Sequence, residues 1–124
     1  MWTYRGYDRD SRGVTAPRIL ALQRWLVSTD PGGKSLGTYA HRPVRGGATP
    51  SVHQTGRAID WQPSSHTAGY HLWDVLRAYP EGADIDLIIW EHKQWGGRSG
   101  PVTQAYHGVD PHTGHLHIET RSWE

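Results

Sequence analysis

Two histidine-bearing segments, far apart in the chain, restrict its possible folds more than any other feature. The first is SVHQTGRAID, at residues 51–60, and the second is PHTGHLHIE, at residues 111–119. Neutral imidazoles and a carboxylate are ligands that suit a catalytic metal ion, which takes three of them and keeps a fourth position open. If the two segments form one such site, the fold must bring them side by side.

The second segment alternates between polar and apolar residues. His115, His117 and Glu119 fall on one face of a predicted strand, and Leu116 and Ile118 fall on the other, toward the core. The two histidines would lie about 7 Å apart at the backbone, which lets both rings serve one site. A His-x-His pair alone is commonly a solvated or core pair, so its metal role depends on the first segment.

In the first segment, His53 and Asp60 are separated by an odd number of positions. On a straight strand they would point to opposite faces, so the chain must bend between them. Gly56 permits that bend because glycine tolerates a positive φ. We therefore expect His53 on a loop and Asp60 on the strand that follows.

The rest of the chain predicts a single α+β domain over residues 1–124. Apolar residues at helical spacing predict helices near 15–29, with Thr15 as the cap, and at 67–79, ended by Pro80. The run IDLIIW at 85–90 predicts a central strand, with a short strand expected near Tyr39. Residues 1–14 are expected to be an extended lead-in and 96–109 a loop. Two helices and several short strands without regular alternation favour an antiparallel sheet with flanking helices.

The composition excludes several classes of function. The formal net charge of +1 provides no field for holding a nucleic acid. The absence of cysteine excludes thiolate ligands and a cysteine nucleophile. No apolar run is long enough for a membrane span, and the polar start of the chain is not that of a signal peptide. We expect a monomer.

The first segment resembles the S-x-H-x-x-G-x-A-x-D signature of the D-alanyl-D-alanine carboxypeptidase and L,D-endopeptidase family of zinc peptidases. That family shares its fold with the hedgehog signalling domain and the lysostaphin-type endopeptidases, and HLH resembles the H-x-H of their last ligand. The stretch YHGVDPHTGHLHIE is similar to the end of peptidase domains in actinobacterial cell-wall enzymes and phage endolysins. The resemblance covers residues 39–120. It implies a small hedgehog/DD-peptidase-like domain with zinc held by His53, Asp60 and His117.

The general base departs from the pattern of many carboxypeptidase-type members. They place a Glu or Asp three residues before the last histidine ligand, where this chain has Gly114. The first histidine of H-x-H is the base in the lysostaphin-type branch, so the resemblance assigns this role to His115. Asp110 and His112 are the reserve candidates. The competing role for His115 is a fourth ligand that closes the site.

Further residues are assigned to substrate and to ligand support. In the resembling family an arginine and the motif serine hold substrate carboxylates or carbonyls, which implies such a role for Arg42, Arg45 and Ser51; ordinary loop surface is the alternative for the arginines. A ligand imidazole also needs an acceptor for its other nitrogen. Glu119, Asp110 and backbone carbonyls are candidates, although we expect Glu119 to be a solvated strand residue.

These features predict a zinc metallopeptidase that cuts peptidoglycan stem or cross-link peptides, either as a carboxypeptidase or as an endopeptidase. As an endolysin domain it would be made in the host cytoplasm and act on the cell wall; otherwise it would be secreted, or reach the wall as part of a larger protein. The alternative is a non-catalytic, zinc-containing cell-wall-binding module of the same fold. A histidine-metal nuclease is a third hypothesis, but Pro111 and the following strand pattern do not fit its hairpin and helix.

Overall fold

A computed structural model describes residues 2–8, 12–39, 51–108 and 112–124 of the chain. Over these residues the fold is a small α+β domain, as predicted. Its helices are α1 (Pro17–Thr29), η1 (Val52–Thr55), α2 (His66–Ala78), α3 (Pro80–Ala83) and η2 (Gly97–Ser99). Its strands are β1 (Lys34–Gly37), β2 (Ala58–Gln62), β3 (Ile85–Trp90), β4 (Lys93–Gly96), β5 (Thr103–Ala105) and β6 (Leu116–Thr120).

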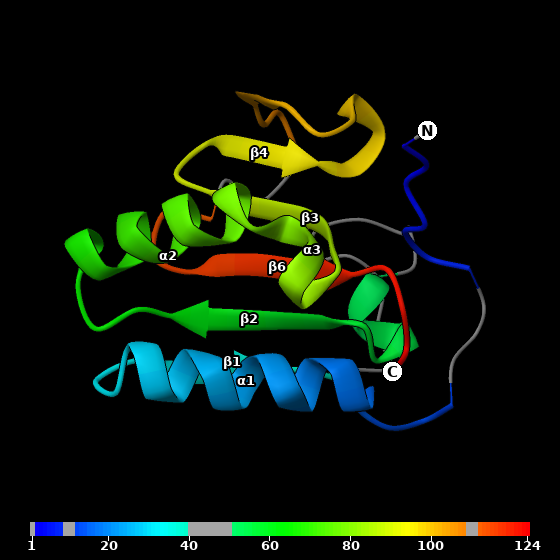
Figure 1. The fold of residues 1–124 in the computed structure, drawn as a ribbon, viewed down its shortest axis with the longest axis horizontal. Helices are drawn as coiled ribbons and strands as arrows, with labels where there is room; N and C mark the ends of the chain where they lie inside the picture. Colours follow the sequence, from blue (N-terminus) through cyan, green and yellow to red (C-terminus); the bar gives the residue numbers. More distant parts are fainter. Residues whose placement is uncertain (1, 9–11, 40–50, 109–111) are drawn as a thin grey trace.

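The strands form one antiparallel sheet in the order β1-β2-β6-β3-β4-β5 (Figure 1). Helix α1 packs on β2 and α2 packs on β3, and both helices lie on the same face of the sheet. Side chains from this face and from the helices form one buried core: Ile19, Leu22, Leu26, Ile59, Trp61, Leu72, Trp73, Leu76, Ile88, Trp90, Leu116 and Ile118. The opposite face of β2 and β6 is therefore left for polar side chains.

The predicted helices and the strands nearest the site agree with the structure, but several details differ. Helix α1 begins after Ala16, and Thr15 instead bonds to Thr38 through the two hydroxyl groups. The first strand ends at Gly37, before the position expected near Tyr39. Pro80 starts the short helix α3. The predicted loop 96–109 contains β5, because its backbone pairs with β4 and lengthens the sheet.

Asp30 joins the end of α1 to the end of β2. Its carboxylate is 5% exposed and accepts hydrogen bonds from Trp61 Nε1 at 3.2 Å, from Ser64 N at 3.0 Å and from Ser64 Oγ. Burial alone would raise the pKa of Asp30, but the hydrogen bonds from Ser64 and Trp61 outweigh it and hold the pKa below its usual range. The ionised carboxylate therefore stabilises the fold.

We expect Asp30→Ala to lower the free energy of unfolding by about 2–4 kcal/mol at pH 7, because buried donors lose a charged acceptor. Urea unfolding measures the loss, with the exposed Asp74→Ala as the control. Because the folded pKa is lowered, the stabilisation is present above the unfolded value of about 3.9 and is lost as the pH falls through the folded pKa. Asp30→Asn and the wild type should therefore converge in acid. Equal stability of Asp30→Ala and the wild type at pH 7 would contradict the stabilising role of the Asp30 carboxylate.

Candidate metal centre

The pairing of β2 with β6 places two of the predicted ligands opposite each other. Asp60 and His117 are cross-strand partners in this antiparallel pair. Their neighbours Ile59 and Ile118 point into the helix-covered core, so alternation along each strand directs Asp60 and His117 to the other face. Two residues far apart in sequence are thereby fixed side by side by the sheet register.

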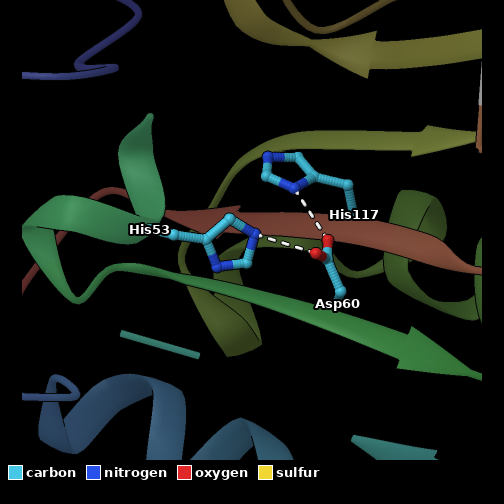
Figure 2. A group of neighbouring side chains, drawn as sticks. All are labelled: His53, Asp60 and His117. Atoms are coloured by element: carbon cyan, nitrogen blue, oxygen red, sulfur yellow. Dashed lines mark hydrogen bonds and ion pairs between the residues drawn. The ribbon is translucent and has the colours of Figure 1, made fainter. Parts of the chain in front are cut away.

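The third predicted ligand, His53, lies in the short helix η1 rather than on a loop. Ser51 caps this helix, and its Oγ accepts a hydrogen bond from His53 N at 3.2 Å. Gly56 ends η1 with φ 83° and turns the chain into β2, as predicted for this position. His53 is only 4% exposed and points over β2 toward Asp60 (Figure 2).

The turn at Gly56 predicts a strong effect of a single methyl group. A Cβ there would lie 2.2 Å from the backbone oxygen of Val14, and the left-handed conformation adds about 1–2 kcal/mol for a residue other than glycine. We expect Gly56→Ala to lower the melting temperature by 10 °C or more (about 2 kcal/mol or more). Gly82→Ala is the matched control, since its φ is not positive and no atom of the described residues crowds the new Cβ. Circular dichroism measures the melting temperatures. Equal values for Gly56→Ala and the wild type would contradict the assignment of this turn to Gly56.

The carboxylate of Asp60 lies between the two histidine rings (Figure 2). His53 Nε2 is 3.1 Å from Asp60 Oδ2, and His117 Nδ1 is 3.0 Å from Asp60 Oδ1. The ring centroids of His53 and His117 are 5.1 Å apart. The ligand atoms of these three residues all lie within 4.8 Å of one another, so the group can hold a metal ion.

The outer nitrogen of each ring contacts an acceptor. His53 Nδ1 lies 2.6 Å from the Thr38 carbonyl oxygen, and His117 Nε2 lies 2.7 Å from Glu119 Oε2. Because these oxygens accept, each outer nitrogen donates, and a neutral ring then directs the lone pair of its inner nitrogen at Asp60. Among the described residues, the closest polar group to His53 Nε2 is the Asp60 carboxylate, at 3.1 Å, and the contact lacks the geometry of a hydrogen bond. Two imidazole nitrogens and a carboxylate therefore converge, and a cation between them would be held by all three groups.

The contacts between these three residues also shift the pKa values of Asp60 and His117. Burial would raise the pKa of Asp60, but its contacts with His117 and His53 prevail and hold the pKa well below its usual range. Burial would lower the pKa of His117, but hydrogen bonds to Asp60 and Glu119 raise it to about 10. A metal ion that binds His117 must displace this proton, so metal binding and protonation compete.

His115 and His112 lie at the edge of the same site. Ligand atoms of Asp60, His112 and His115 also fall within 4.8 Å of one another. The ring of His112 is 4.7 Å from that of His115 and 5.3 Å from that of His117. Its backbone has a φ of 56°, and its carbonyl accepts a hydrogen bond from Glu91 N. The predicted base and one reserve candidate are therefore both within reach of the proposed ligands.

Arg42, Arg45 and Asp110 lie outside the described residues. Ser51 is 6% exposed and caps η1, and its contact with substrate stays a prediction.

The expectation that Glu119 is solvated is wrong. It is 3% exposed and accepts from both His117 and Tyr4. The alternation of β6 already placed Glu119 on the face of His117. No sequence pattern indicated that Thr38 would contact His53 or that Tyr4 would contact Glu119.

The fold and the site define a small α+β domain in which two histidines and a partly buried aspartate form a group that can hold a metal ion. A family model described as the C-terminal domain of VldE matches residues 11–117, and the chain belongs to this family. No curated protein and no solved structure matches the chain. The resemblance to the zinc peptidases stays a prediction. Among the described residues, no helix is long and apolar enough to cross a membrane.

Proposed function

We propose that this domain is a zinc-dependent peptidase that hydrolyses an amide bond in the stem or cross-link peptides of bacterial peptidoglycan, as in the catalytic domain of an endolysin. The observation that carries the proposal is the convergence of two imidazole nitrogens on the two oxygens of one partly buried carboxylate. The resemblance of SVHQTGRAID and HLH to zinc peptidase motifs supports the choice of metal and substrate.

His53 Nε2, the Asp60 carboxylate and His117 Nδ1 would hold the ion. Two imidazoles and a carboxylate match the ligand set of catalytic zinc, with a fourth position left open. Zinc supplies Lewis acidity there, since it lowers the pKa of a water molecule toward about 7 and polarises a carbonyl group. When the ion is bound, Thr38 and Glu119 would accept from the outer nitrogens of the two histidines and so fix their tautomers.

His115 would act as the general base. It is partly exposed, directly before β6, and lies beside Asp60, so it can reach both solvent and the reacting atoms. Its imidazole would take a proton from the attacking water and deliver it to the leaving amine, a role that histidine fills more often than any other side chain. His112 is the reserve candidate for the general base, and its ring lies against that of His115.

Digestion of defined muropeptides, followed by mass spectrometry, tests the proposal. We expect products that gain one water, that disappear with a chelator and that return when zinc is restored. Release of D-alanine alone would identify a carboxypeptidase, and a split stem or cross-link would identify an endopeptidase. Zinc-loaded protein that gives no new product would contradict the peptidase.

Gly114 favours a second candidate function, because it provides no carboxyl group where many of the peptidases that the motifs resemble carry their acid. The domain would then be a zinc-containing module that binds the cell wall without cutting it. Co-sedimentation of zinc-loaded protein with purified peptidoglycan that stays chemically intact would support this function over hydrolysis.

A further inference from the structure

We propose that the N-terminal segment, residues 2–8, is part of the metal centre, and that Tyr4 is a positioning residue that acts on His117 through Glu119. This inference rests on the metal-binding part of the proposed function. Nothing in the sequence motifs points to this segment, which was expected only to be an extended lead-in.

A continuous chain of contacts links Tyr4 to the candidate ligands. Tyr4 OH donates to Glu119 Oε1 at 2.6 Å, and His117 Nε2 donates to Glu119 Oε2 at 2.7 Å. His117 Nδ1 then faces Asp60 Oδ1 at 3.0 Å. Each oxygen of the Glu119 carboxylate therefore has its own donor, and these two donors set the plane of the carboxylate. Since Glu119 is 3% exposed, water cannot readily replace either donor.

The segment is anchored on both sides of Tyr4, so the phenol is held in place. The backbone N–H groups of Arg5 and Gly6 donate to the fully buried carboxylate of Asp86, at 3.1 and 3.0 Å. The buried Arg57 guanidinium donates to the Gly6 carbonyl and also to a backbone carbonyl of β6, so it links the segment to that strand. On the other side, Trp2 Nε1 donates to the carbonyl of residue 97 at 2.8 Å.

The expected consequence concerns metal affinity. A carboxylate that accepts from the outer nitrogen of a ligand histidine fixes the ring and makes its inner nitrogen a better ligand, and loss of such a partner typically weakens metal binding by 10–100-fold. Without the Tyr4 hydroxyl, Glu119 Oε1 becomes a buried acceptor without its donor, and the carboxylate can rotate away from His117. Tyr4 thus stabilises the metal-binding orientation of a ligand that it does not touch.

Tyr4→Phe removes this hydroxyl and keeps the ring. We expect zinc affinity to fall by about tenfold, the low end of the range for such partners, in competition with a chromophoric chelator at fixed pH. Tyr79→Phe makes the same change at an exposed tyrosine. It is the matched control and should not change the zinc affinity. Chemical shifts of the His117 ring in the zinc-loaded protein provide a second readout, because Tyr4→Phe should weaken the hydrogen bond from Nε2–H to Glu119.

A double-mutant cycle separates positioning from a general effect on folding. If Tyr4 acts through Glu119, Tyr4→Phe should weaken zinc binding no further in a Glu119→Gln background. Additive losses, or a Tyr4→Phe variant that binds zinc as tightly as the wild type, would overturn the inference while leaving the proposed function standing. A wild-type protein that binds no zinc would overturn both.

Discussion

Asp60→Asn should abolish tight zinc binding and, with it, peptide cleavage. Asp60 provides the negative charge of the proposed ligand set, and both of its oxygens face imidazole nitrogens, at 3.0 and 3.1 Å. The asparagine amide is neutral and can offer only one oxygen. We expect zinc affinity to fall by about 100-fold or more, since even partners outside the ligand set contribute 10–100-fold. Chelator competition and metal analysis after dialysis measure the loss.

Asp74→Asn is the control for this substitution. This substitution makes the same change of charge in an exposed side chain on α2, where Asp74 pairs with Arg77. That variant should bind zinc and cleave substrate like the wild type. An Asp60→Asn protein that kept zinc affinity within a few-fold of the wild type would show that the ion, if bound, sits elsewhere.

His115→Ala should give the second largest effect and a different pattern. Under the proposed mechanism the three ligands remain, so zinc stoichiometry and affinity should stay close to those of the wild type. The rate of cleavage should fall by about 10²–10⁴-fold, the usual contribution of a positioned general base. The measurements are kcat/KM on a defined muropeptide and zinc content of the same sample.

Two further variants serve to interpret the result for His115→Ala. His71→Ala changes an exposed histidine on α2 and should leave both quantities unaltered. His112→Ala tests the reserve candidate, whose ring lies against that of His115. If His115→Ala lost zinc together with activity, His115 would be a fourth ligand; if it kept full activity, the base would be another group.

The parts of the fold that the sequence predicted are those set by local patterns. The apolar run at 85–90 and the alternation after His115 correspond to β3 and β6, and Gly56 makes the predicted bend. The spacing of the first motif also placed Asp60 on β2. These features depend on side-chain periodicity and on backbone conformation at one glycine, both of which can be read from a short stretch of sequence.

The parts that it did not predict depend on contacts between distant segments. Thr38 supports His53 through a backbone carbonyl, which every residue possesses, so its identity carries no signal. Tyr4 reaches Glu119 across most of the chain length. Glu119 is buried because the N-terminal segment lies beside β6, whereas alternation alone indicated a face open to water. Strand β5 pairs through backbone groups and has three exposed residues, so no hydrophobic pattern marks it.

Anomalous diffraction at the zinc edge, from crystals of the zinc-loaded protein, would locate the ion directly. We predict one peak within about 2.0–2.2 Å of His53 Nε2, an Asp60 carboxylate oxygen and His117 Nδ1, with His115 beyond bonding distance and a fourth position open to water. A peak with His115 as a fourth protein ligand would contradict a catalytic centre of this design. The absence of any peak among His53, Asp60 and His117 would contradict the metal centre itself.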